Sequence, residues 1–360
     1  MNGLLERIKS PEPYSHAGKM ATTNGFPMNI PSTMRAVLFD RPCDADGLYI
    51  GEFPTPQPTS QEILVKVTAS ALNRADILQR KGQYPPPPGA SKILGLEMAG
   101  EVVQVGPEVT KWKVGDQVCG LLAGGGQAEY AVIQEDIAMP IPPGLSVEAA
   151  AAIPEVFMTA FHALDWKAEL QKGEDILIHA GASGVGTAAI QIARAMGARV
   201  LVTASAGKHD YCRSLGATLA IDYKTEQFEQ VVRKFTHGQG VHVILDFIAA
   251  AYFQQNINTL SMDGRMVMLA LMGGIKMEKL SLINIVSRRL SIMGSTLRNQ
   301  SRTYKAQLSQ SFQNFAWPLF EADKLKPVID QILPLDAVSD AHRLIESNQT
   351  IGKIVLRISD

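Results

Sequence analysis

The apolar positions of the chain follow two different patterns in its two halves. From Met34 to Val132 they form short strands separated by glycine and proline, which is typical of a compact β-barrel. These expected strands cover residues 34–39, 62–70, 94–106, 114–120 and 124–132. Further along, short apolar runs alternate with helical periodicity, which indicates βαβ units and a parallel sheet. The sequence therefore predicts two differently built domains.

The second half is expected to contain six strands of one open sheet, with helices between them. The strands are predicted at residues 176–178, 200–203, 219–222, 241–247, 265–270 and 290–294. Helices are predicted at residues 146–152, 154–164, 187–196, 208–215, 228–235 and 252–260. The tail adds a helix at 304–322, a strand at 331–333, a helix at 337–346 and a strand at 353–358, and we expect it to return to the first domain.

A glycine-rich turn lies between the first of those strands and its helix. Gly181, Gly184 and Gly186 have the spacing G-x-x-G-x-G, and the helix that follows ends at Gly197. In a strand–turn–helix setting, bare backbone N–H groups and the positive helix end can hold a pyrophosphate. A glycine turn that only packs a helix on a sheet is the alternative. The context favours a dinucleotide site, with Ser183, Gly184, Val185 and Gly186 as its binding residues.

The strand predicted at residues 200–203 follows the helix after the glycine turn, and the residues at its end indicate which cofactor is bound. An enzyme that uses NAD places Asp or Glu there to bind the ribose 2′-OH. This chain instead has Thr203-Ala-Ser-Ala-Gly-Lys208, and the Lys208 cation can pair with a 2′-phosphate. The alternative is a solvated lysine at a helix start, and Asp210 lies nearby. We predict NADPH as the cofactor.

The length, charge and cysteine content of the chain limit the classes of function that it can have. The 360 residues suffice for about two domains, and 34 Lys and Arg nearly cancel 35 Asp and Glu. This balance argues against nucleic acid or an anionic membrane as the main partner. No apolar run reaches the ~18 residues of a membrane-spanning helix. Three separated cysteines, at positions 43, 119 and 212, indicate a reducing compartment, and we expect a cytoplasmic protein.

The N-terminal extension, the histidines and the cysteines are not predicted to take part in the chemistry. Residues 1–33 mix Pro, Asn, Ser, Thr and Gly without a hydrophobic signal core, so we expect a disordered N-terminal extension. Nothing in the chain has metal-ligand spacing, so we expect no metal. His179 lies on a buried strand and is interpreted as a core histidine, and Cys119 as a small apolar residue.

A set of motifs in fixed order points to a family. They are Ala71-Leu-Asn-Arg-Ala-Asp76, Gly82-Gln-Tyr-Pro-Pro-Pro-Pro, Leu94-Gly-Leu-Glu97, Gly126-Gln-Ala-Glu-Tyr130, Ile178-His-Ala-Gly-Ala-Ser-Gly-Val-Gly-Thr-Ala188, Ile244-Leu-Asp-Phe, Leu271-Met-Gly-Gly274 and Asn348-Gln-Thr-Ile-Gly-Lys-Ile-Val-Leu. With them the chain resembles the zinc-free quinone oxidoreductases of the medium-chain dehydrogenase/reductase superfamily. The p53-inducible branch is the most similar. The resemblance extends from Met34 to the C-terminus.

The resemblance implies a fold, a cofactor and an assembly. It implies a GroES-like catalytic domain at residues 34–156 and 300–360 and a Rossmann domain at 157–299, with the active site between them. NADPH would be the hydride donor, and two chains would form a homodimer through the Rossmann sheets. The Leu290–Gly294 edge strand is the candidate contact.

The resemblance also assigns roles to individual residues. It places Asn73 and Thr159 beside the nicotinamide or the acceptor, and Tyr84 in the pocket wall on a proline-stiffened loop. A plain packing role for Tyr84 is the alternative. The remaining cofactor contacts implied by the family are Tyr223, near the 2′-phosphate, and Phe247, Leu269, Met272 and Gly273, along the cofactor face.

These residues predict an NADPH-dependent quinone reductase that works without metal. The first alternative is an alkenal or enoyl reductase, which uses the same hydride but needs a placed acid to protonate carbon. Asp76 is a candidate by position, although a carboxylate that anchors a helix is at least as compatible with it. The second alternative is a non-catalytic NADPH-binding protein, crystallin-like or RNA-binding.

Overall fold

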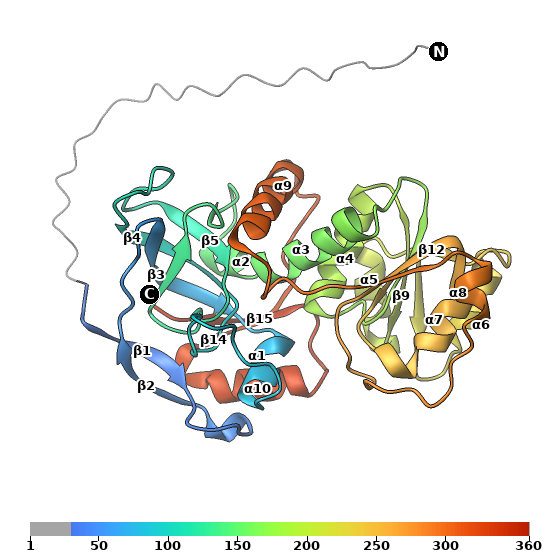
Figure 1. Ribbon diagram of the computed structural model, residues 1–360, viewed down its shortest axis with the longest axis horizontal. Helices are drawn as coiled ribbons and strands as arrows, with labels where there is room; N and C mark the ends of the chain where they lie inside the picture. The colour runs from blue at the N-terminus through green and yellow to red at the C-terminus, as the bar shows by residue number, and fades with distance from the viewer. Residues whose placement is uncertain (1–29, 360) are drawn as a thin grey trace, which may run out of the picture. The chain divides into compact units, whose positions relative to one another are not determined.

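The computed structural model describes residues 30–359, which carry β-sheets of two, six and seven strands (Figure 1). The predicted disordered extension at residues 1–33 lies almost entirely outside this range. No helix among the described residues is long and apolar enough to cross a membrane.

The first half of the chain forms the seven-stranded sheet, and the C-terminal tail completes it. Its strands are β3 (Glu62–Ala71), β4 (Glu97–Val105), β5 (Gln117–Leu121), β6 (Tyr130–Gln134), β7 (Met139–Pro140), β14 (Ile329–Pro334) and β15 (Lys353–Arg357). They run in the order β14-β15-β3-β4-β5-β7, and β6 pairs with the other edge of β3. Because β15 pairs antiparallel with β3, the predicted return of the tail is confirmed. Strands β1 (Thr33–Leu38) and β2 (Tyr49–Pro54) form a separate hairpin around η1 (Ala45–Gly47).

The second half forms a six-stranded parallel sheet. Its strands are β8 (Asp175–Ile178), β9 (Arg199–Ala204), β10 (Leu219–Asp222), β11 (Val241–Asp246), β12 (Leu260–Met268) and β13 (Ser291–Gly294). The order β10-β9-β8-β11-β12-β13 reverses direction between β8 and β11, which is the point where doubly wound sheets bind ligands. The prediction of six strands in one open sheet is confirmed.

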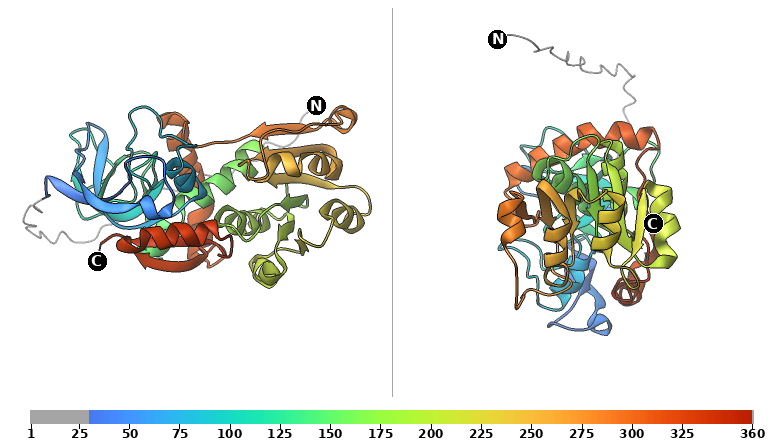
Figure 2. Two further views of the ribbon diagram at one scale, coloured as in Figure 1. Left: turned by 90° about the horizontal axis from the view of Figure 1, so that it is seen from below. Right: turned by 90° about the vertical axis from the view of Figure 1, so that its right-hand side faces the viewer.

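Helices alternate with these strands, as the periodicity predicts. They are α4 (Gly184–Ala195), α5 (His209–Leu215), α6 (Phe228–Phe235), α7 (Phe253–Thr259) and α8 (Ile283–Ser287), with short 3₁₀ turns η3 (Ala206–Lys208) and η4 (Ala249–Ala251). Figure 2 shows them on both faces of the sheet. The fold class is therefore the predicted one, an α/β chain with a GroES-like barrel and a Rossmann sheet.

Two helices bring the sheets together in one hydrophobic core. They are α3 (Pro154–Phe161), which continues as a π-helical turn η2 (His162–Lys167), and α9 (Arg302–Glu321). The rings of Phe157 and Phe320 meet edge to face at 5.3 Å, and the cluster around them includes Ala71 of β3 and Ile178 of β8. Since α3 crosses one predicted domain boundary and α9 begins at the other, the boundaries at residues 156 and 300 stay predictions.

Several elements differ from the sequence-based expectation. Strand β12 begins at Leu260 rather than at residue 265, and the α-helix expected to reach residue 164 changes to π-helical geometry at His162. Strand β2 and helix α1 (Arg74–Arg80) carry no strong apolar periodicity of their own. The remaining elements are α2 (Val147–Ala151), α10 (Val338–Glu346) and η5 (Leu335–Ala337).

Candidate cofactor and substrate site

The glycine turn after β8 is stabilised by a helix cap and by close packing around its glycines. The Ser183 hydroxyl accepts a hydrogen bond from the Gly186 N–H at 3.1 Å and so caps α4. A Cβ at Gly186 would lie 2.3 Å from the carbonyl oxygen of Ala180, and one at Gly184 would lie 2.8 Å from the Lys353 side chain. Ala180 itself has a positive φ of 49°. Close packing against backbone therefore requires glycine at position 186, while Ser183, Gly184 and Val185 line the cavity at the N-terminus of the helix, where a phosphate can bind.

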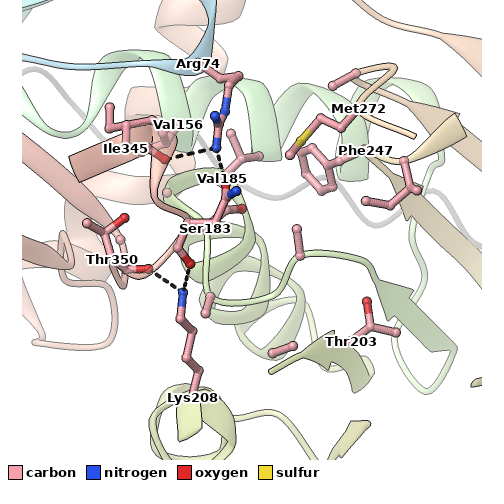
Figure 3. A pocket seen from close by; sticks show the side chains of 18 of the residues that line it. Arg74, Val156, Ser183, Val185, Thr203, Lys208, Phe247, Met272, Ile345 and Thr350 are labelled. Atoms are coloured by element: carbon pink, nitrogen blue, oxygen red, sulfur yellow. Dashed lines mark hydrogen bonds between the residues drawn. The ribbon is translucent and has the colours of Figure 1, made fainter. Parts of the chain in front are cut away.

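A cavity of about 360 Å³ opens beside this turn (Figure 3). Phe247, Ile248, Tyr252, Ala270 and Met272 supply much of its apolar wall, and Thr203, Ser205 and Lys208 lie at the end of β9. The opposite wall comes from the other half of the chain, through Leu72, Asn73, Arg74, Val156, Ile345, Asn348, Thr350, Gly352 and Lys353. Its position at the reversal of strand order and its mixture of apolar wall and glycine cradle fit a dinucleotide.

The segment from Asn348 to Lys353 crosses from α10 to β15 and lies against the glycine turn. The Gly352 N–H donates to the Ala182 carbonyl at 2.9 Å. Lys208 Nζ donates to the carbonyl oxygens of Asn348 and Thr350 at 2.8 and 2.7 Å. Figure 3 shows these two bonds, which join the Rossmann part to the C-terminal segment. Partial burial lowers the pKa of Lys208.

A buried polar network lies behind the Asn73 and Lys353 wall. Glu97 accepts hydrogen bonds from Asn73 Nδ2 at 2.9 Å and from the Glu155 N–H at 2.8 Å. Lys353 Nζ lies 2.8 Å from Glu97 Oε1, and it also donates to Asn73 Oδ1 at 2.6 Å. The side chains of Lys353 and Glu97 are 3% and 0% exposed, so this is a buried ion pair with its polar atoms satisfied.

Asp76 anchors the start of α1, which is one of the two roles considered for it. Its carboxylate accepts from the N–H groups of Asn73 and Gly95 at 2.8 and 2.9 Å. Burial raises the pKa of Asp76 to about 6, and those two backbone hydrogen bonds oppose the rise. The carboxylate is almost fully buried and already bonded, so it serves to fix the backbone around Asn73.

His179 is a buried histidine with satisfied ring nitrogens, as its strand position indicates. Nδ1 lies 3.0 Å from the Thr203 hydroxyl and Nε2 lies 2.7 Å from Asn256 Oδ1. Desolvation lowers its pKa, so the ring is neutral. Since Thr203 lines the cavity, His179 orients a hydroxyl in the cavity wall.

The structure brings most of the predicted site residues together. Those that line the cavity are Asn73, Ser183, Gly184, Val185, Lys208, Tyr223, Phe247 and Met272. Leu269 and Gly273 are not among the lining residues, and their N–H groups donate to the carbonyls of Asp246 and Ile248. Gly186 is inside α4, and Thr159 is half-buried on α3. The roles of all these residues remain predictions.

Tyr84 does not line the cavity. Its ring lies under the Arg298 guanidinium at 5.0 Å, and its hydroxyl is 3.4 Å from the Thr296 hydroxyl. Arg298 also donates to the Tyr84 carbonyl at 3.1 Å and to Gln79 Oε1 at 2.6 Å. Arg298 therefore fixes this loop, in addition to the proline stiffening that the sequence predicts.

In the wall contributed by the other half of the chain, Asn73 was predicted from the sequence as a site residue and the remaining residues were missed. Arg74 donates to the Ile345 carbonyl at 3.2 Å and to Asn348 Oδ1 at 2.5 Å, and it lines the cavity with Thr350. The motif Asn348–Leu356 was available as a family signal. Its place against the glycine turn depends on a chain reversal that local patterns do not encode.

Two family models match the chain. The alcohol dehydrogenase GroES-like domain matches residues 59–143, and a domain described as zinc-binding dehydrogenase matches residues 184–314. Among the described residues, no group of three or more His, Cys, Asp or Glu side chains is placed to hold a metal ion.

Several known proteins are similar to this chain over most of its length. A crystal structure of an NAD-dependent alcohol dehydrogenase is 32% identical, with a TM-score of 0.80, over 91% of this chain and 100% of that one. The CurK enoyl reductase is 28% identical, with a TM-score of 0.81, over the same shares of the two chains. The phthioceranic/hydroxyphthioceranic acid synthase of Mycobacterium bovis is 32% identical over 318 residues, which is 88% of this chain. This match spans only 15% of the length of that synthase.

The chain thus belongs to the medium-chain dehydrogenase/reductase superfamily and has the NAD(P)-binding fold of that superfamily.

The buried pair of Lys353 and Glu97 gives a stability prediction. Lys353→Met leaves the Glu97 carboxylate and Asn73 Oδ1 without their cation, and we expect a loss of about 3–5 kcal/mol in the free energy of unfolding. Chemical denaturation followed by circular dichroism measures it. Arg289→Met removes an exposed partner of Asp263 and is the matched control, with little expected change. Equal midpoints for the two variants would contradict the prediction.

Proposed function

We propose that this protein reduces a carbon–carbon double bond conjugated to a carbonyl, as an NADPH-dependent enoyl or alkenal reductase. The observation that carries the proposal is its likeness, along nearly the whole chain, to the CurK enoyl reductase. The synthase relative supports the same direction, because this chain matches one small part of that much longer enzyme, as a single reductase unit would. The apolar wall of the cavity at Ile248, Ala270 and Met272 suits a flat, uncharged acceptor.

A quinone reductase without metal is the second candidate. The motifs around Asn73 and the Gly82–Pro88 loop resemble that family, and a quinone needs no acid placed at carbon. The two candidates share the cofactor and the cavity. They differ only in where the substrate takes up its proton.

The cofactor would lie along the cavity from the glycine turn to the apolar wall. Ser183, Gly184 and Val185 would hold its pyrophosphate, while Phe247 and Met272 would pack on the nicotinamide half. When bound, NADPH supplies a hydride to the acceptor. For this protein the task is to orient the acceptor, exclude water and place a proton donor.

The residues at the end of β9 support NADPH over NADH. No carboxylate stands at Thr203, Ala204 or Ser205, which line the cavity. Lys208, Tyr223 and Lys224 line an adjoining hollow, so a 2′-phosphate there would meet cations rather than an acid. A phosphate is also a stronger acceptor for Lys208 than the two neutral carbonyls it now contacts.

An acceptor comparison tests the proposed reaction. Purified protein with NADPH is expected to reduce a 2-enoyl thioester or an alkenal faster, in kcat/KM, than an ortho-quinone. Oxidation of NADPH is followed by absorbance and the saturated product by mass spectrometry. Turnover of the quinone alone would reject the enoyl assignment in favour of the second candidate, and cofactor binding without any turnover would favour a non-catalytic protein.

Lys208 gives a test of cofactor choice. In Lys208→Ala we expect the Kd of NADPH to rise about tenfold or more, because a charge-assisted hydrogen bond is lost, while the Kd of NADH stays unchanged. Fluorescence titration measures both values. Lys234→Ala, at an exposed lysine of α6, is the control. An equal loss for both cofactors would mean that Lys208 only holds the C-terminal segment.

The exposed apolar surface beside β13 supports a homodimer. Strand β13 pairs only with β12 among the described strands, so its other edge is open. Ile283 and Val286 of the neighbouring α8 are 67% and 76% exposed, and Leu282 is 58% exposed. We propose that a second copy pairs with this edge and covers these side chains, as the sequence leads us to expect.

Light scattering after gel filtration tests the dimer. Val286→Asp is expected to convert it to a monomer, because a charge would be buried in the apolar contact. Val114→Asp, at an exposed valine of the other sheet's periphery, is the control and should leave the mass unchanged. A wild-type protein that is monomeric at micromolar concentration contradicts the proposal.

A further inference from the structure

Helix α3 carries one partly exposed side on an otherwise buried helix. Of its eight residues, Glu155 and Thr159 are half-buried and the other six are buried. The two are four positions apart, so their side chains lie on the same face. Val156 beside them lines the cavity. Glu155 and Thr159 are not among the residues that line the cavity, but the Glu155 N–H bonds to Glu97, which also binds Asn73 of the cavity wall. A carboxyl and a hydroxyl therefore lie on one partly exposed side of a helix that borders the cavity.

Glu155 differs from the two neighbouring acids in having no partner. Glu97 and Asp76 are saturated by the hydrogen bonds already described. The Glu155 carboxyl makes no hydrogen bond or ion pair with any described residue, whereas its backbone N–H is held by Glu97 at 2.8 Å. The backbone position is thus fixed while the side chain stays free to meet a ligand.

The charges around Glu155 come from five elements. Asp76 of α1 and Glu97 of β4 are acidic, whereas Lys353 of β15, Arg298 of the segment before α9, and Lys305 of α9 are cationic. Burial and the negative charge of Glu97 raise the pKa of Glu155 to about 8, against the opposing effect of Lys353 and Arg298. At pH 7 the carboxyl therefore holds its proton, and it gives the proton up in the physiological range.

We propose that Glu155 is the general acid of this site and delivers the proton that completes reduction of the conjugated double bond. This inference rests on the proposed enoyl reductase function and supplies the placed acid that the sequence alone does not identify. Asp76, the candidate by sequence position, is excluded because both of its oxygens anchor backbone N–H groups.

The proposed reduction consists of hydride transfer to one carbon of the double bond and proton transfer to the other. The β-carbon of the substrate gains the hydride with its electron pair, and the π electrons move toward the carbonyl to give an enolate. The α-carbon then forms a C–H bond as the O–H bond of Glu155 breaks, which leaves a carboxylate and NADP⁺. Because the side chain is partly exposed, it regains a proton from water. A quinone takes up its proton at oxygen, directly from water, so it does not require Glu155.

The test compares Glu155→Gln with wild type on both acceptors. The amide keeps the shape of the side chain and cannot donate an acidic proton. We expect kcat for an enoyl thioester to fall by about 10²–10⁴-fold, while ortho-quinone reduction and NADPH binding change by less than a few-fold. In wild type, kcat for the enoyl substrate should fall as pH rises through about 8, and this limb should be missing in the variant.

A second readout does not depend on activity. Infrared difference spectra of the cofactor-free protein, wild type minus Glu155→Gln, should show a protonated carboxyl band that disappears around pH 8. Glu229→Gln, also in the first turn of a helix, is the matched control and should alter neither readout. Melting temperatures verify that the variants fold, and Glu155→Asp, which keeps an acid on a shorter arm, should retain part of the activity.

The outcomes separate the two proposals. Equal loss on both acceptors, unchanged enoyl turnover in Glu155→Gln, or a carboxyl band that titrates near pH 4 overturns the role of Glu155 and leaves the enoyl reductase function standing. A wild-type protein that reduces quinones but no enoyl substrate overturns both.

Discussion

The carboxylate of Glu97 is the contact on which the site depends. It binds Asn73 before α1, Lys353 at the start of β15 and the backbone of Glu155 at the start of α3. Three segments far apart in the sequence are therefore fixed to one buried charge. A buried ion pair costs desolvation, but each polar atom here has a partner, and the gain is a unique arrangement of the substrate side of the cavity.

The cofactor side is ordered by different means. The glycine turn accepts close contact from the Lys353 side chain, and the Asn348–Lys353 segment is joined to it by the Gly352 hydrogen bond. Lys208 adds two bonds from the opposite direction. The cavity thus has walls from both sheets, and the shared core around Phe157 keeps those walls in register.

Most of the architecture was predictable from local patterns. The six parallel strands, the glycine turn and α9 each have a periodicity or a terminating residue that does not depend on the rest of the chain. Elements without such signals were missed or misplaced, such as β2 and the start of β12. The same distinction holds for the site, where the residues around β8 and β9 were found and Arg74 and Thr350 were not.

The sequence by itself determined the fold class, the dinucleotide turn and the absence of an acid at the end of β9, because these follow from residue type and short-range order. Only the tertiary structure decided that Asp76 anchors backbone, that Tyr84 lies under Arg298 outside the cavity, and that burial raises the pKa of Glu155. Partners, burial and pKa are set by segments that meet only after folding, so no local pattern can specify them.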